Sequence, residues 1–126
     1  MPSLWGRRVK LVENTGGVAL DFDPTTSTLK VGGPITLADA ASETFVLEEL
    51  VWGMAVSSAT QANPTYDEYV LFIADEGNHC THMVASANTA NSDSAGDFCV
   101  YVASNVLTFK NNRGANRYVT YWLFGA

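Results

Sequence analysis

The sequence is poor in charge and contains no long hydrophobic run. Charged residues make up 16% of its 126 residues, against about 25% in an average soluble domain. A chain with so few charges either builds a large core or buries part of its surface in an assembly. No stretch approaches about 18 consecutive apolar residues, so we expect no insertion into a membrane. The N-terminus lacks a continuous apolar core, and we therefore expect no signal peptide.

Basic residues are also scarce, and they gather at the two ends of the sequence. Residues 1–10 contain three of them and residues 110–126 another three, whereas the segment between holds all 13 acidic residues and a single lysine. A nucleic-acid-binding surface needs Lys and Arg clustered over a broad face, so we expect no nucleic-acid partner. The basic N-terminal end either reflects ordinary scatter or docks on an acidic neighbour.

Cysteine is limited to Cys80 and Cys99. Without a secretion signal, two buried free thiols are the expected state. A disulfide between them remains an alternative, because the sequence does not give the distance between the segments that carry them.

One cluster contains metal-binding residue types, His79-Cys80-Thr81-His82. On a strand, Cys80 and His82 share one face, while His79 lies on the other. No second group completes a tetrahedral site, so these three residues are weak candidates and we expect no metal or other cofactor. Asp21 and Asp23 lack the further oxygen ligands of a calcium loop, and we interpret them as solvent-facing residues beside a turn.

Motifs of catalysis are missing as well. The adjacent acidic pairs, at residues 48–49, 67–68 and 75–76, would point to opposite faces of a strand and could not share a substrate. The sequence contains no nucleophile elbow, no phosphate-binding Gly-rich loop and no HExxH zinc motif. We therefore expect a protein without enzymatic activity and assign no catalytic residue.

Alternating apolar residues are the strongest pattern that is present, above all along residues 117–124. Both faces of this predicted strand are apolar, so it should be central and covered on both sides, or covered on one side by another subunit. Because the sequence stops one residue after Gly125, we expect the strand to belong to the body of the domain. The two faces are formed by Tyr118, Thr120, Trp122 and Phe124, and by Val119, Tyr121 and Leu123.

Similar short strands recur at intervals of about ten residues, with turn signals between them. This pattern predicts an all-β protein, an antiparallel β-sandwich that is jelly-roll-like or lectin-like. We expect residues 1–16 to form a short N-terminal arm and residues 17–126 to form a single β-sandwich domain. The arm carries apolar anchors beside basic residues, and it either packs on its own domain or docks on another subunit. The expected docking residues are Leu4, Trp5, Arg7 and Arg8.

Local signals predict four further features. Residues 17–33 are typical of a hairpin that turns at Pro24–Ser27. Gly32-Gly33-Pro34 should break the ladder, because proline cannot donate a hydrogen bond. Residues 35–50 favour a turn or short helix that leads into a strand. Residues 88–97 contain no large side chain and should form an exposed loop tip.

A polar loop between the last two strands is the best candidate for binding a partner. It contains Asn111, Asn112, Arg113 and Asn116, whose side chains are rich in hydrogen-bond donors and could contact a glycan or a protein. It could equally be a long hairpin turn that uses Asn and Gly for positive φ. The aromatic residues could form a sugar-binding shelf, but their alternation within strands favours a core or interface role.

Two stretches resemble bacteriophage virion proteins. Residues 22–37, FDPTTSTLKVGGPITL, resemble passages of phage tail-fibre and tailspike chains in which a polar turn separates two strands. Residues 105–126, NVLTFKNNRGANRYVTYWLFGA, are similar to the closing strands of small β-sandwich domains on phage fibres, capsid decorations and lectin-like trimers. The sequence departs from long fibres because it has no repetitive shaft and no separate anchor domain.

The resemblance implies a homotrimeric β-sandwich that is part of a virion, with no catalytic residues to carry over. A short tail-fibre knob, a tail-tip component or a capsid decoration protein fits the length. Such a protein would be made in the host cytoplasm and would contact copies of itself, other virion proteins and, as a further candidate, a host-surface glycan. Few charges and strands that are apolar on both faces agree with burial against identical copies. The alternative function is a carbohydrate-binding, lectin-like module without catalysis.

Overall fold

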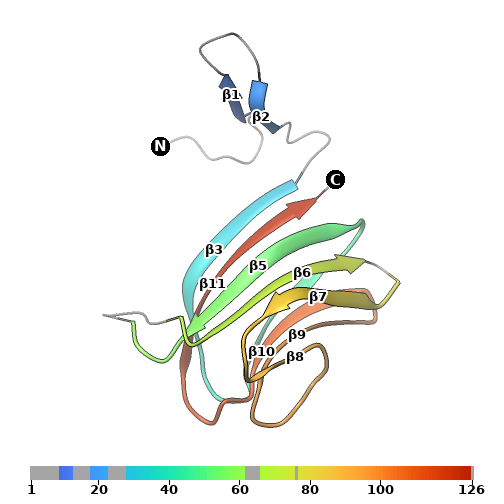
Figure 1. Cartoon of the computed structure of the whole chain (residues 1–126). Coiled ribbons are helices and arrows are strands. Elements are labelled where there is room, and N and C mark those ends of the chain that lie inside the picture. Colours follow the sequence, from blue (N-terminus) through green and yellow to red (C-terminus); the bar gives the residue numbers. More distant parts are fainter. Residues whose placement is uncertain (1–8, 13–17, 23–27, 62–65, 76, 126) are drawn as a thin grey trace.

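The computed structural model describes residues 9–12, 18–22, 28–61, 66–75 and 77–125, with side chains from residue 31 onward. In these residues the protein consists of strands and turns alone, which confirms the predicted all-β class. Two sheets face each other and enclose the core, so the fold is a β-sandwich (Figure 1). The described part of the chain contains no helix that is long and apolar enough to cross a bilayer.

The larger sheet has five strands, each antiparallel to its neighbours. The predicted C-terminal strand is central, because it pairs with a neighbour on each side over nearly its whole length. Valine, isoleucine and aromatic residues fill these strands, as expected of residues that pack well on a pleated surface. The order across the sheet is β3 (Thr28–Leu37), β11 (Arg117–Gly125), β5 (Val51–Ser58), β6 (Glu68–Asp75) and β7 (His79–Ala85).

The smaller sheet has four strands and is mixed. Its two central strands form a hairpin, and the last strand runs parallel to its neighbour. The positive φ angles of Ser104 and Asn105, 51° and 63°, form the two-residue turn of that hairpin. The order is β4 (Ser42–Val46), β10 (Val106–Asn111), β9 (Phe98–Ala103) and β8 (Thr89–Ala90).

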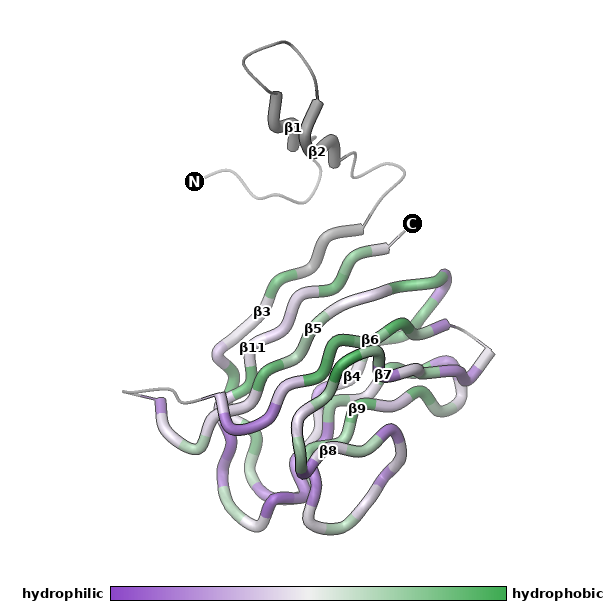
Figure 2. The backbone as a smooth tube through the Cα atoms, in the orientation of Figure 1, coloured by the Kyte–Doolittle hydropathy of each residue, from purple (hydrophilic) through white to green (hydrophobic). Residues whose placement is uncertain are grey.

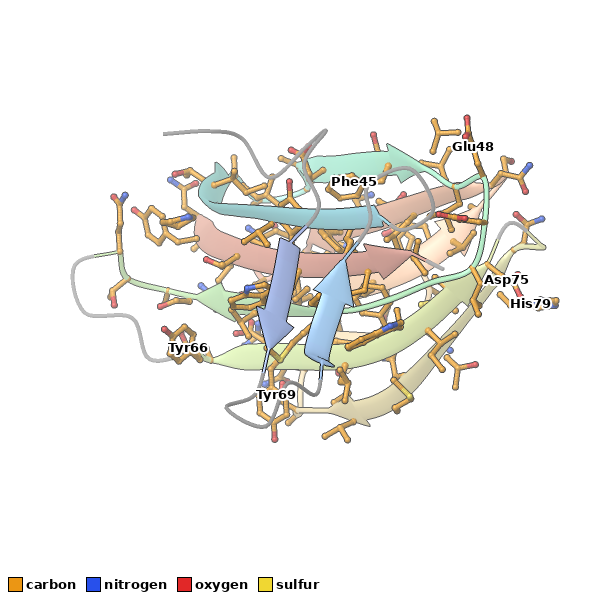
Figure 3. The ribbon with its side chains drawn as sticks, turned by 90° about the horizontal axis from the view of Figure 1, so that it is seen from above. Phe45, Glu48, Tyr66, Tyr69, Asp75 and His79 are labelled. Atoms are coloured by element: carbon orange, nitrogen blue, oxygen red, sulfur yellow. The ribbon has the colours of Figure 1, made fainter. Side chains whose placement is uncertain are left out.

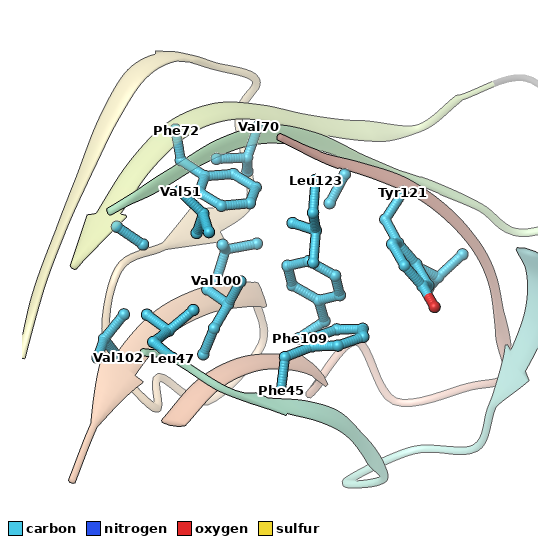
Figure 4. Packing of buried hydrophobic residues seen from close by; sticks show 14 of the residues in the cluster. Phe45, Leu47, Val51, Val70, Phe72, Val100, Val102, Phe109, Tyr121 and Leu123 are labelled. Carbon is cyan, nitrogen blue, oxygen red and sulfur yellow. The ribbon is translucent and has the colours of Figure 1, made fainter. Parts of the chain in front are cut away.

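The core between the sheets is centred on four aromatic rings (Figure 4). Phe45 and Phe109 belong to the smaller sheet, and Phe72 and Tyr121 belong to the larger one. The ring centroid of Phe109 lies 5.9 Å from that of Phe72 and 5.5 Å from that of Tyr121. Such ring pairs add about 0.5–1.5 kcal/mol each beyond the burial of their area, so they join the two sheets tightly.

The hairpin predicted within residues 17–33 is wrong. The apolar run Val18–Phe22, β2, pairs with β1 (Val9–Val12) and forms a separate two-stranded sheet with it. The following run, in β3, pairs instead with β11. Turn residues act locally, whereas the partner of β3 comes from the other end of the sequence, so the turn signal at residues 24–27 could not reveal the pairing. Strand β1 also lies inside the segment that we expected to be an arm.

The structure also tests the predictions made for residues 32–34 and for residues 35–50. Gly32-Gly33-Pro34 interrupts the ladder as expected, because Gly33 and Pro34 have no paired residue on β11, but β3 continues through it to Leu37. Residues 35–50 contain no helix; a turn around Asp39 and Ala40 leads directly into β4. The β-branched and aromatic residues of β4 therefore outweighed the helix propensity of the neighbouring alanines.

Candidate functional site

The outward surface of the larger sheet is apolar and exposed. The exposed fractions of Val31, Trp52 and Val84 are 53%, 48% and 52%. Single exposed apolar residues are common on soluble proteins, but a contiguous group of them is unusual. Figure 2 shows the hydrophobic stretches of β5 and β6 that run through the middle of this sheet. We define the outer apolar face as the surface formed by Val31, Trp52, Met54, Leu71, Ile73, Val84, Trp122 and Phe124.

Strand register makes this face continuous. Directly paired residues of neighbouring strands lie on the same side of a sheet, so their side chains are in contact. One row of such residues crosses all five strands and consists of Val31, Trp122, Met54, Leu71 and Val84. Beside this row, the rings of Trp52 and Phe124 stack with centroids 4.4 Å apart and planes inclined by 17°.

Charge is confined to the border of this face. The outward positions of the two central strands, β11 and β5, hold only apolar, aromatic and hydroxyl side chains. The carboxylate of Asp75 lies at the end of β6 and β7, where its Oδ1 is 3.1 Å from His79 Nδ1 (Figure 3). The middle of the face therefore offers burial of apolar area without the cost of desolvating a charge.

A hollow of about 160 Å³ continues the face at the opposite end of β5 and β11. Its floor includes outward residues of these strands. Its walls come from Pro34 of β3 and from Thr60, Gln61 and Tyr66, which are described residues between β5 and β6. Tyr66 is labelled in Figure 3. The lining includes Pro34, Val56, Ser58, Tyr66, Tyr118 and Thr120.

The predicted binding loop does not present most of its side chains to a ligand. Asn111 is fully buried, and its amide nitrogen donates to the carbonyl oxygens of Leu37, at 2.9 Å, and Ala115, at 2.7 Å. Its side-chain oxygen accepts a hydrogen bond from the backbone of Arg113 at 2.9 Å. Asn111 thus supports the turn itself, and of the four predicted residues only Asn116 is exposed.

Asn112 and Arg113 hold the neighbouring segment, residues 88–97. Asn112 donates to Asp93 Oδ1 at 2.8 Å and to the carbonyl of Ser94 at 3.0 Å. Arg113 donates to the carbonyl of Gly96. The expected exposed loop tip is therefore a surface segment fastened to its neighbour, and it includes the short strand β8.

A buried carboxylate joins the same loop to the larger sheet. Glu68, at the start of β6, is fully buried, and its Oε1 lies 2.7 Å from Arg113 Nε and 3.3 Å from Arg117 Nε. Its Oε2 has no hydrogen-bond partner among the described residues. Burial of one carboxylate between two guanidinium groups is a structural arrangement, and it explains why Arg113 is not available to a partner.

The candidate metal ligands do not converge. His79 contacts Asp75 at the surface, whereas Cys80 and His82 point inward to the same carbonyl oxygen of Val100, at 3.5 and 2.8 Å. They thereby connect the edge strand β7 to β9 of the opposite sheet. Within the described residues no group of three or more metal-ligating side chains comes together.

Both cysteines are free thiols, as expected. Burial raises the pKa of Cys80 to about 11. Burial likewise raises the pKa of Cys99, whose sulfur accepts a hydrogen bond from the backbone of Ser94 at 3.4 Å. Both thiols therefore stay protonated at neutral pH and belong to the packing of the protein.

The remaining sequence-based candidates lie outside the described part of the chain. Leu4, Trp5, Arg7 and Arg8 fall in residues 1–8, and Asp23 falls in residues 23–27. The sequence does not reveal the hollow, because its lining comes from four separate segments. The one signal for it was the polar stretch TQANPTYD, residues 60–67, of which Thr60, Gln61 and Tyr66 line the hollow.

Comparison of this chain with protein-family models, with curated proteins and with solved structures finds no match. The site must therefore be interpreted from its own geometry.

Proposed function

We propose that the protein is a non-enzymatic structural subunit of a bacteriophage virion, and that it forms a homotrimer through the outer apolar face. The observation that supports self-association is the uninterrupted apolar row across five strands. Contiguous exposed apolar surface of this kind marks interaction sites in soluble proteins. Each square ångström of apolar surface removed from water contributes about 25 cal/mol, so a face of this extent favours a stable contact.

The chemistry of the face favours a second copy of the same chain as its partner. The chain has a net charge of −6, so copies repel one another at most orientations. Contact through a face without central charges keeps the like charges of the two copies apart. In a trimer, the three equivalent faces would turn toward the threefold axis and each would be covered by the other two.

Light scattering tests this assembly. The full chain should have three times the mass of one 13.6 kDa chain. Met54→Glu places a charge at the centre of the apolar row and should yield a folded monomer, because burying an unpaired carboxylate in the contact is costly. Val46→Glu is the matched control, since Val46 is 76% exposed on the smaller sheet, and this variant should remain trimeric. A monomeric wild type, or a trimeric Met54→Glu variant, would contradict the proposed assembly.

The virion location needs a separate test. Within the proposal, residues 1–8, with Leu4, Trp5, Arg7 and Arg8, dock the trimer on a capsid or tail protein. A chain lacking residues 1–8 should still form trimers, because self-association resides in the larger sheet. Antibodies against the chain should label purified phage particles in electron micrographs. Particles that remain unlabelled while the infected-cell lysate reacts would argue against the virion role.

A further inference from the structure

The larger sheet departs from regular geometry on two sides of the hollow. On one side, the register between β3 and β11 passes from Ile35 opposite Val119 to Gly32 opposite Tyr121, which leaves Gly33 and Pro34 facing the single residue Thr120. Bulges of this kind bend a strand and re-aim side chains, and they are common beside functional sites.

The bulge depends on Gly33. Its φ of +99° is strained for any residue with a side chain, and a Cβ atom there would clash with the carbonyl oxygen of Val119. Pro34, which follows, has no backbone N–H and therefore leaves no unpaired donor where the ladder is interrupted. The sequence Gly-Pro thus opens the sheet edge at low cost and forms one wall of the hollow.

Tyr66 forms the other side and also has an unusual backbone. Its φ is +50°, in the left-handed region that bulky side chains rarely adopt, and 58% of its surface is exposed. Strain of this kind persists where the surroundings fix it, and it gathers at ligand-binding sites. Here the residue that carries the strain is an exposed aromatic ring beside a hollow.

The segment that carries this wall is fastened at its base. The backbone N–H of Ala59 donates to Asp67 Oδ2 at 2.7 Å, which joins the two ends of the segment. Ser58 Oγ donates to the carbonyl oxygen of Thr60 at 2.8 Å, which fixes the first turn. These two bonds hold the described ends of the segment in place without a ligand, so binding need not spend free energy on ordering them.

The lining is uncharged and combines two kinds of group. Tyr66, Tyr118 and Pro34 offer apolar surface, while the Thr120 hydroxyl and the Gln61 amide offer hydrogen-bond donors and acceptors. A ligand that matches has an apolar face and a rim of hydroxyl groups and bears no charge. A sugar ring has this character, since its C–H groups can lie on an aromatic face. The volume is well below the roughly 300–1,000 Å³ of pockets for drug-sized ligands, which limits the occupant to one ring.

We propose that the hollow bounded by Pro34, Tyr66, Tyr118 and Thr120 binds a single neutral sugar ring, such as the terminal residue of a surface glycan. Its location differs from the loop 111–116 that sequence reasoning favoured, because the side chains of Asn111, Asn112 and Arg113 are engaged within the protein. The hollow lies two strand positions beyond Trp122 of the outer apolar face. It is complete within one chain, so sugar binding does not depend on the proposed trimer.

Saturation-transfer NMR with a panel of methyl glycosides tests the proposal. The panel contains glucose, galactose, mannose and N-acetylglucosamine derivatives, with the charged N-acetylneuraminic acid derivative as a comparison. At least one neutral glycoside should bind, with a Kd on the order of 1 mM for a single ring. The charged sugar should bind more weakly, because the lining offers it no cation. If no neutral glycoside gives a signal at tens of millimolar, the proposal is wrong.

Substitutions locate the site. Tyr118→Ala and Tyr66→Ala should each weaken binding up to about tenfold, in line with the 0.5–1.5 kcal/mol of an aromatic contact. Tyr101→Ala, on β9 of the other sheet, is the matched control and should bind as the wild type does. Equal affinity in all three variants would place the sugar elsewhere and overturn the assignment.

The same titration in the Met54→Glu background separates this proposal from the proposed assembly. A monomer that still binds the glycoside supports a site within one chain. Loss of binding in a folded Met54→Glu monomer would show that the site needs neighbouring copies, and would overturn the present assignment while leaving the assembly intact. Binding by a wild type that proves monomeric would leave the sugar site standing and remove the trimer.

Discussion

The two faces of the larger sheet are built from similar residues but have different surroundings. On β6, Phe72 is fully buried against Phe109 of the opposite sheet, while its neighbour Ile73 is 37% exposed. On β11, Leu123 lies in the core and Trp122 lies in the outer apolar row. Hydrophobicity alone therefore does not distinguish the face that packs against the smaller sheet from the outer apolar face. The inner face stabilises the monomer, and we infer that the outer face stabilises the assembly.

The sharpest test of this difference compares the adjacent residues Phe72 and Ile73. Phe72→Ala should lower the free energy of unfolding by about 3–5 kcal/mol, because it empties a ring-sized space in a packed core. Ile73→Ala should lower it by about 1 kcal/mol or less, because the side chain already contacts water. Both changes are measured by urea denaturation in the Met54→Glu background, so that dissociation of the trimer does not contribute.

Equal losses in the free energy of unfolding for Phe72→Ala and Ile73→Ala would contradict the difference that we infer between the two faces. They would mean that the outer face is covered within a single chain and is not available to other copies.

The buried ion pair at the end of the inner face should give the next largest effect. Glu68→Gln removes the negative charge that lies between Arg113 and Arg117 and leaves two guanidinium groups without their counter-charge. We expect a loss of about 3 kcal/mol in the free energy of unfolding. The control, Glu48→Gln at an exposed position, should change stability by less than about 0.5 kcal/mol. A Glu68→Gln variant as stable as this control would show that the carboxylate contributes nothing to holding the loop 111–116.

The alternation of apolar side chains along the sequence predicted the all-β class, the central position of the C-terminal strand and the two apolar faces of that strand. It could not predict which of the two faces would be exposed, because the packing of the second sheet determines which face is buried. It also misassigned the partner of β3, since turn residues at 24–27 act locally while β11 is distant in the sequence. Pairing between distant segments is decided by the whole fold, and short-range signals do not contain it.

The candidate sites show the same limit. Asn111–Arg113 were chosen because polar residues in a loop often bind ligands, but their groups are used within the protein. Asn111 bonds the backbone of Leu37 and Ala115, whereas Asn112 and Arg113 contact the segment 88–97 and the buried Glu68. His82 and Cys80 looked like ligands, and both contact the carbonyl of Val100. The sequence does not show the hollow, because Pro34, at the bulge, and Tyr66 come together only in the folded chain.

Cysteine reactivity reports on the inner face at the edge strand β7. The pKa of Cys80 rises from 9.0 to about 11, so two pKa units reduce the thiolate fraction at pH 8 about a hundredfold. Because the thiolate is the nucleophile, alkylation of Cys80 by iodoacetamide should be slower by a similar factor than in the unfolded chain. Mass spectrometry should show neither cysteine modified in the native protein and both modified in guanidinium. Rapid labelling of Cys80 in the native state would show that β7 opens readily, and the edge of the core would then be less protected than we infer.

The aromatic stack on the outer apolar face should contribute little to folding. Trp52→Ala removes the ring that lies 4.4 Å from Phe124, and in the Met54→Glu background it should cost at most about 1.5 kcal/mol, because both rings are already partly in water. In the otherwise unchanged protein, the same substitution should shift the trimer toward monomer at low micromolar concentration, since a large aromatic residue at the centre of a contact contributes strongly to binding. The two readouts are denaturation of the monomeric background and light scattering across a dilution series. A large loss of monomer stability with no change in dissociation would reverse the roles that we assign to the two faces, because the stack would then belong to folding and not to assembly.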